Sequence, residues 1–412
     1  VAGVDQPQRV YLQVGLKGSE RFGWRRPPLD VVLVVDAALR LGQPRAYAEA
    51  VDTLLAKLSP VDRLAVIHAG PRPTTALALS AVRDAKIRRA DLLAPGRGAA
   101  RNGDLPAALG RAGQLLRDGE QGARVPGTGT VVLLTRAGSE ALVARTARAA
   151  HALTVAGAVT SVISTDERAP WWRVAKAGHG NDHRGRRVAD ALQAELTSLS
   201  KVIARLLRLN VRLGPNAHGI KILGSRILTQ AEKRRVKARE EATDKQISKS
   251  LGVTADRGAD DDGLQTVIPF FYGGDAHVVL IELWVEKPGA VADITLKYKD
   301  MVSLQNATAR TSVRVGAVPR APGPAELLVL SNLQGFQLAQ ALREAGDLAR
   351  RGDLRGAQRR LRAAPRRRSA DEALVHAFSD LLNAGGPAPT LGRALTLAAR
   401  RRISPSPAVA RR

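Results

Sequence analysis

Between Leu29 and Leu199, short apolar runs alternate with segments of helical periodicity, a pattern that few folds accommodate. The runs are rich in β-branched residues and apolar on both faces, as expected for strands buried within a parallel sheet. This order predicts an α/β domain with a doubly wound parallel sheet covered by helices on both faces. The expected strands are Val31 to Asp36, Leu64 to Ala69, Ala76 to Ser80, Val131 to Thr135 and Val159 to Ser164, and the expected helices are Arg45 to Leu58, Leu105 to Leu116 and Arg186 to Leu199.

A strict two-residue alternation of apolar and polar side chains flanks this region on both sides. Antiparallel sheets typically have one buried face and one solvent-exposed face, so we expect a β-sandwich. Val10 to Lys17 is expected to be one of its strands, which would make the α/β domain an insertion into the sandwich. The aromatic residues Phe270, Phe271 and Trp284 are expected to fill the sandwich core. The other expected strands are Leu207 to Leu213, Val278 to Val285, Ala292 to Tyr298 and Arg310 to Val315.

Two helical regions complete the expected organisation. Residues 229–250 begin with Thr229 and Glu232 in capping-box spacing, and their mixed charges indicate a solvated helix inserted in the sandwich. After a linker rich in Pro and Gly, Gln337 to Ala364 resembles a single tetratricopeptide-like helix pair, with little apolar periodicity beyond it. The expected domains are therefore 1–28 (a strand joining the sandwich), 29–200 (α/β), 201–318 (β-sandwich) and 319–412 (linker and Arg-rich helical tail).

The chain is strongly basic, with 64 Lys and Arg against 38 Asp and Glu and a net charge of +26. Such a balance favours acidic partners, whether proteins, nucleic acids, anionic lipids or polysaccharides, although a general Arg bias would produce the same numbers. From residue 321 onward there are 16 Arg, no Lys and seven acidic residues. We expect this tail to bind the partner through its clusters Arg366, Arg367, Arg368, Arg400, Arg401 and Arg402.

Several classes of chemistry are excluded or unsupported. The chain has no cysteine, which rules out disulfides, thiolate catalysis and Cys-ligated metals. It has no phosphate-binding loop and no nucleophile elbow, and no nucleophile, base and orienting group can be combined. The apolar runs are shorter than the roughly 20 residues of a membrane-spanning helix. We therefore expect neither an enzyme nor a cofactor.

Four segments resemble the von Willebrand factor type A family: PPLDVVLVVDAALRLG, LSPVDRLAVIHAG, GTVVLLTRAGSE and VTSVISTDERAPWWRVAKAGHG. The resemblance covers about 170 residues and extends to bacterial proteins in which a β-rich region and helices follow the domain. In the family, a magnesium or manganese ion is held at the carboxyl ends of the strands. Its ligands come from a D-x-S-x-S loop, a threonine in a second loop and an aspartate in a third.

The ligand pattern of the family is largely lost in this sequence. Asp36 matches the first aspartate, but Ala38 and Arg40 stand at the serine positions, Gly103 at the threonine position and Arg136 at the third-loop aspartate. Two guanidinium groups beside a divalent cation would be strongly repulsive. We therefore expect no metal at this site, with Asp36 forming an ion pair with the two arginines instead.

Other residues of ligand type carry weaker signals. The aspartates before Gly263 could form a calcium loop, but Gly258 stands where an EF-hand needs an oxygen ligand, so a polar turn is expected. His179 and His183 have an i,i+4 spacing, but the neighbouring glycines argue against a helix and for a surface loop. The aspartates concerned are Asp256, Asp260, Asp261 and Asp262.

The sequence thus predicts a non-enzymatic scaffold, adaptor or adhesion subunit of a bacterial assembly that binds an acidic protein surface without a metal. The alternative is a nucleic-acid-binding protein acting through its basic surface, although no recognised nucleic-acid-binding motif supports it. A chain that begins at Val1 is consistent with removal of a signal peptide, so a periplasmic or cell-surface location is expected, with the cytoplasm as the alternative.

Overall fold

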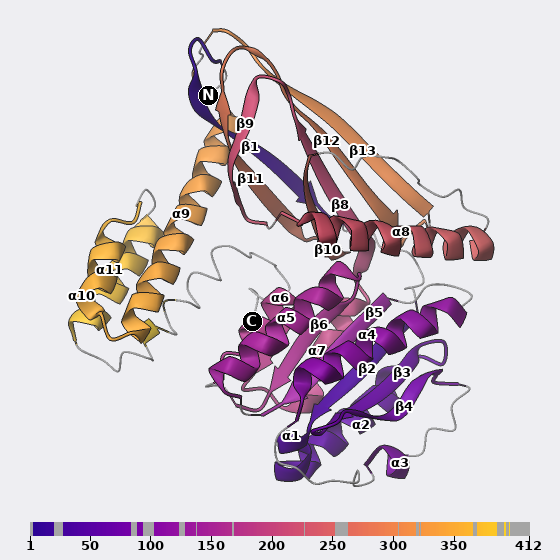
Figure 1. Cartoon of the computed structure of the whole chain (residues 1–412). Helices are drawn as coiled ribbons and strands as arrows, with labels where there is room; N and C mark the ends of the chain where they lie inside the picture. Colours follow the sequence, from indigo (N-terminus) through magenta and orange to yellow (C-terminus); the bar gives the residue numbers. More distant parts are fainter. Residues whose placement is uncertain are drawn as a thin grey trace.

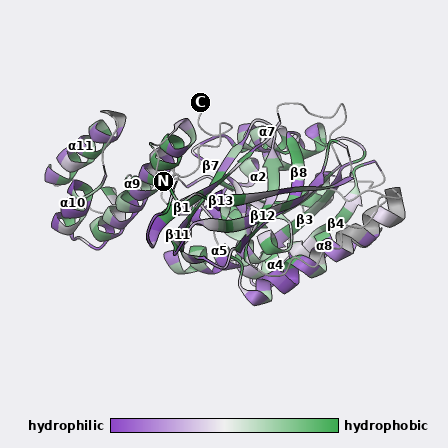
Figure 2. Cartoon of the chain, turned by 90° about the horizontal axis from the view of Figure 1, so that it is seen from above, coloured by the Kyte–Doolittle hydropathy of each residue, from purple (hydrophilic) through white to green (hydrophobic). Residues whose placement is uncertain are grey.

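The computed structural model has three parts: an α/β body, a β-sandwich above it and a group of C-terminal helices (Figure 1). Seen from above, the C-terminal helices lie together at one side of the molecule (Figure 2). The structure describes residues 3–19, 28–83, 89–93, 103–122, 128–136, 138–166, 169–225, 227–251, 263–303, 305–318, 321, 323–365, 369–384, 391–392 and 395.

The α/β body contains a six-stranded sheet in the order β4-β3-β2-β5-β6-β7. All neighbouring strands are parallel except β3 and β4, which are antiparallel. The turn between β3 and β4 is too short for a parallel crossover connection. The expected α/β fold is confirmed, but the sequence pattern missed both the direction of β4 and the existence of the polar strand β7. The strands are β2 (Leu29–Asp36), β3 (Arg63–Ala69), β4 (Thr74–Ala81), β5 (Thr128–Thr135), β6 (Val159–Ser164) and β7 (His179–Arg184).

Helices cover both faces of this sheet because its central strands are apolar on both sides. Along β2, Val31, Leu33 and Val35 pack into one core cluster, and Val32 and Val34 into the other. The first cluster includes residues of α2 and α7, and the second includes residues of α4, α5 and α6. The helices of the body are α1 (Ala37–Gly42), α2 (Pro44–Lys57), α3 (Arg89–Leu93), α4 (Leu105–Gly122), α5 (Glu140–Val155), α6 (Trp172–Ala177) and α7 (Val188–Leu199).

The β-sandwich consists of two antiparallel sheets, in the orders β1-β11-β9 and β10-β8-β12-β13. Val10 lies opposite Leu283, so the expected pairing of Val10 to Lys17 with a strand from the 207–315 region is confirmed. Residues of both sheets meet in one apolar cluster. The strands are β1 (Gln8–Lys17), β8 (Val202–Leu213), β9 (Ala217–Leu223), β10 (Leu264–Tyr272), β11 (Ala276–Val285), β12 (Gly289–Asp300) and β13 (Gln305–Val315).

Two of the three aromatic residues expected in the sandwich core lie elsewhere. Phe270 belongs to the core cluster of the α/β body, and Phe271 packs in a small cluster with Leu207 and Ile268. Trp284 is 41% exposed. The prediction that these rings fill the sandwich core is therefore confirmed for Phe271 and wrong for Phe270 and Trp284. Alternation along β11 turns Trp284 away from the face that carries Leu283 and Val285.

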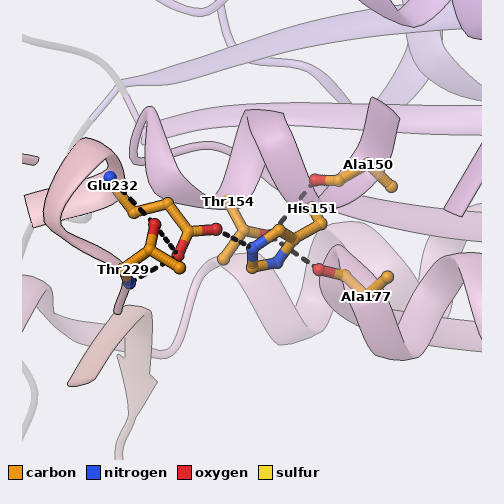
Figure 3. A network of polar contacts seen from close by, with 6 residues as sticks. All are labelled: Ala150, His151, Thr154, Ala177, Thr229 and Glu232. Atoms are coloured by element: carbon orange, nitrogen blue, oxygen red, sulfur yellow. Dashed lines mark hydrogen bonds and ion pairs between the residues drawn. The ribbon is translucent and has the colours of Figure 1, made fainter. Parts of the chain in front are cut away.

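Helix α8 (Gln230–Leu251) connects the sandwich to the α/β body. The expected capping box is present, since Glu232 accepts hydrogen bonds from the amide and hydroxyl of Thr229. The other oxygen of Glu232 lies 2.9 Å from His151 on α5 (Figure 3). Leu228 and Val236 pack beside this contact with Val155 and Val267. A single polar and apolar contact region therefore joins the start of α8 to the body.

The C-terminal helices are α9 (Pro324–Arg350), α10 (Leu354–Arg362) and α11 (Ser369–Asn383). The expected helix pair is present, but α9 begins well before Gln337. The expectation of little apolar periodicity beyond Ala364 is wrong, because Val375, Phe378 and Leu382 of α11 complete the core of this group. Within the described ranges, no helix is long and apolar enough to cross a membrane.

Candidate functional site

The carboxyl ends of β2 and β5 meet at Asp36, which is 3% exposed and caps the N-terminus of α1. One of its carboxylate oxygens accepts a hydrogen bond from the Ala38 amide at 3.2 Å, and the other accepts one from the Thr135 hydroxyl at 2.8 Å. The amide of Arg136 is a third donor. These donors occupy most of the about four lone-pair directions of a carboxylate.

Burial and hydrogen bonding act in opposite directions on the pKa of Asp36. Burial raises the pKa of this carboxyl above its ordinary value, and the hydrogen bonds from Thr135, Ala38 and Arg136 offset the rise only in part. A cationic guanidinium in contact would lower the pKa strongly. The raised pKa therefore agrees with a carboxylate held by neutral donors.

Arg40 is engaged in a different polar chain. Its guanidinium lies 3.4 Å from Nδ1 of His68, whose Nε2 lies 2.8 Å from the Tyr47 hydroxyl. The hydroxyl donates to the carbonyl of Leu92 at 2.5 Å. Since that hydroxyl has one proton, His68 must carry its own proton on Nε2 and accept from Arg40 through Nδ1. Burial and the charge of Arg40 lower the pKa of His68 to about 4, so the imidazole is neutral.

Arg136 is exposed at the same end of the sheet, and one of its guanidinium nitrogens lies beside Gly42, 2.7 Å from where a Cβ would stand. The expected ion pair of Asp36 with Arg40 and Arg136 is therefore wrong in the described part of the chain. Arg40 turns toward His68, and Arg136 contributes its backbone amide to Asp36 while its side chain extends over the end of α1.

Gly103 lies next to Asp36, where the sequence comparison placed it. A Cβ added at Gly103 would be 3.2 Å from the Asp36 carboxylate but only 2.0 Å from the carbonyl oxygen of Ala69. No side chain fits here without a shift of the backbone. The structure thus brings together Asp36, Ala38 and Gly103, and adds Thr135, which the sequence analysis missed. Within the described residues, no group of three or more His, Asp or Glu side chains is arranged to hold a metal ion.

A second buried polar cluster lies beside the edge strand β7, around Glu195 on α7. Its carboxylate is fully buried and accepts from Ser161 at 2.7 Å, Asn181 at 3.0 Å and His183 at 2.9 Å. Burial raises the pKa of Glu195, but the bonds from His183, Ser161 and Asn181 outweigh it and lower the pKa overall. The Ser161 hydroxyl is itself fully buried and holds the Glu195 carboxylate in place.

This cluster corrects the expectation of a surface loop at His179 and His183. Both residues belong to strand β7, which pairs with β6. The contact of His183 with Glu195 fastens this edge strand to the helix behind it. The remaining site predictions lie outside the described residues. They concern Asp256, Asp260, Asp261, Asp262, Arg366, Arg367, Arg368, Arg400, Arg401 and Arg402.

No protein-family model and no curated protein matches this sequence. Among solved structures, the chain is similar to a von Willebrand factor type A protein from Catenulispora acidiphila, with 15% identity and a TM-score of 0.58 over 92% of this chain and 90% of the other. It is also similar to the ArnB paralog VWA2 from Sulfolobus acidocaldarius, with 14% identity and a TM-score of 0.54 over 97% and 95% of the two chains. The von Willebrand factor type A fold and the added β-sheets and helices are therefore shared over most of the chain, despite the low identity.

Proposed function

We propose that this protein is a non-enzymatic scaffold or adaptor that binds a protein partner at the carboxyl end of its parallel sheet without a metal ion. The fold supports this proposal, since domains of the von Willebrand factor type A fold usually serve in adhesion and protein interaction. The proposal includes an acidic partner, because the chain carries a net charge of +26.

One observation carries the proposal. At the strand ends, Asp36 is buried and already satisfied by neutral donors, whereas the guanidinium of Arg136 is exposed. An exposed guanidinium can take a partner carboxylate directly, in two parallel hydrogen bonds. The strand ends therefore offer a partner a positive group of the protein itself. The Arg clusters of residues 366–368 and 400–402 would add attraction that weakens with salt.

The test is recovery of the partner from the cells that make the protein, with a chelator and with added magnesium, manganese or calcium in parallel. We expect equal recovery in every condition. Arg136→Glu should abolish recovery, whereas Arg148→Glu, the same charge change at an exposed position of α5, should leave it unchanged. Loss of the partner in chelator, or equal recovery by both variants, would contradict the proposal.

The nucleic-acid alternative predicts a different result in the same experiment. Binding to phosphates would be distributed over many basic residues, so Arg136→Glu and Arg148→Glu would each weaken it slightly and equally. Nuclease treatment of the recovered complex would then release the bound material.

A further inference from the structure

Strand β13 forms one border of the four-stranded sheet, and much of its length is exposed. Its neighbour on one side is β12, and within the described residues no strand pairs with its other side. The short bridge between Gly3 and Gly316 lies beyond its end. All residues from Thr308 to Ser312 are exposed, and Figure 1 shows the strand along the outer border of the sandwich, away from α9. Between Ala309 and Val315, an edge of this kind presents backbone N–H and C=O groups that can pair with another chain.

The border strand at the other side of the same sheet is partly covered. The carbonyl of Gln265 on β10 accepts a hydrogen bond from the amide of Leu228, and Val267 packs against the start of α8. Strand β13 therefore offers the longer accessible edge of this sheet.

The outer face beside β13 is basic. On β13, Arg310 lies opposite Thr295 of β12, and Arg314 lies opposite Ala290 of β12. Lys297 of β12 lies between Thr308 of β13 on one side and Arg208 of β8 on the other. Since residues paired in register share a face, these basic side chains lie on the same side of the sheet. Asp293, bonded to Ser312 at 2.6 Å, is the acidic residue on this face of β12. The basic residues of the face are Arg205, Arg208, Arg212, Lys297, Lys299, Arg310 and Arg314.

Helix α8 shows how this face receives a carboxylate. Glu240 of α8 lies 3.4 Å from Arg208, which is almost fully buried beneath the helix. The part of the face near β13 continues the same charge pattern but is open, since Arg212, Arg310 and Arg314 are exposed. Neither Arg310 nor Arg314 forms an ion pair with a described residue.

We propose that β13 is a docking edge for an acidic segment of another protein, which adds to the sheet as an extended strand with its carboxylates facing Arg310 and Arg314. The main chain supplies the pairing, and the alternate side chains supply the selectivity. A second copy of β13 is a poor occupant, because pairing two such strands brings arginines together, and like charges across a strand pair are destabilising. This surface is separate from the strand-end site around Asp36, and the inference does not rest on the function proposed there.

The spacing of the arginines defines a probe. Arg310 and Arg314 are four residues apart on one face, so a matching strand carries acids at the same spacing. The probe is a labelled eight-residue peptide of valine and threonine with glutamate at its second and sixth positions. Binding to the full chain is followed by fluorescence anisotropy. Two further versions carry N-methyl groups on alternate amides, one version for each edge of the peptide strand.

Charge-reversed variants of the protein provide the controls. R310E/R314E should bind the peptide about tenfold more weakly, since each cross-strand charge pair contributes modestly. R355E/R359E makes the same change at exposed positions of α10 with the same spacing and should bind like the unmodified chain. R310E/R314E should in turn bind a version of the peptide with lysine in place of glutamate, which also shows that the variant is folded.

The proposal also requires that N-methylation of one peptide edge, but not of the other, abolishes binding. Absence of saturable binding by the unmodified chain would overturn it, as would equal affinity of the two double variants. If both methylated peptides bind as well as the parent, or if a single-stranded oligonucleotide binds equally well with the same dependence on Arg310 and Arg314, the surface is a general anion-binding face and strand addition is wrong.

Discussion

Replacement of Asp36 by alanine should destabilise the fold at neutral pH far more than replacement by asparagine. Asp36→Ala removes the acceptor for the Thr135 hydroxyl and for the amides of Ala38 and Arg136. Leaving buried donors without a partner costs about 1 to 3 kcal/mol of unfolding free energy, with part of the loss recovered if water enters. Asp36→Asn keeps one oxygen acceptor and has no charge to bury, so its stability should stay within about 1 kcal/mol of the unmodified chain.

The sign of the pH dependence follows from the raised pKa of Asp36. Between the ordinary pKa of an aspartate and this higher value, the folded chain binds more protons at Asp36 than the unfolded chain does. Its contribution to stability is therefore present at low pH and is lost as the pH rises through that window. Asp36→Asn lacks this loss, so the stability difference should move in favour of the asparagine variant as the pH rises.

Urea unfolding at several pH values, followed by the fluorescence of the chain's tryptophans, measures both effects, since Trp171 is buried in the α/β body. Each titration is repeated with magnesium, manganese, calcium and a chelator. The reasoning is refuted if asparagine is as damaging as alanine at neutral pH. It is also refuted if a divalent cation stabilises the unmodified chain and has no effect on Asp36→Asn, because Asp36 would then act as a metal ligand.

Three further predictions concern the same body. Gly103→Thr should destabilise the fold by at least about 2 kcal/mol, since its Cβ would overlap the Ala69 carbonyl. It should also fail to create a metal site, and stoichiometric magnesium binding in calorimetry would contradict that expectation. Glu195→Gln should lower the free energy of unfolding by about 2 to 4 kcal/mol at neutral pH and by less in acid. Because the pKa of Glu195 is lowered, its contribution to stability is present above the ordinary glutamate pKa and is lost as the pH falls. A cost that stays constant across pH would argue against a charged Glu195. The His68 ring should titrate in NMR spectra at a pH of about 4, and a midpoint near the ordinary histidine value would show that it is not held between Arg40 and Tyr47.

The sequence predicts local features of this fold well and long-range partners poorly. The apolar runs that became β2, β3, β5 and β6 need no partner to be recognised, because burial on both faces is visible in composition. Strand β7 is polar, and its position depends on Glu195, which comes from a later helix. Nothing local in its sequence indicates a strand.

Long-range partners were also hard to predict at the strand-end site. The resemblance to the von Willebrand factor type A family implied that Asp36, Ala38 and Gly103 lie together, and the structure has them together. The partner of Asp36 could not be predicted, because Thr135 is 99 residues away and looks like the end of an apolar run. Charge alone favoured the arginines as partners, whereas burial of the carboxylate favours neutral donors that are already fixed by the backbone.

The position of β1 has a consequence for the order in which the chain can fold during synthesis. Its partner β11 is synthesised only after the entire α/β body and α8. The body can form its own two-sided core before that point, since domains fold as units while the chain grows. Until β11 emerges, the first strand has no neighbour in its sheet and its apolar face is unprotected. The first strand of the chain can therefore be completed only late in synthesis, after the body that follows it in the sequence.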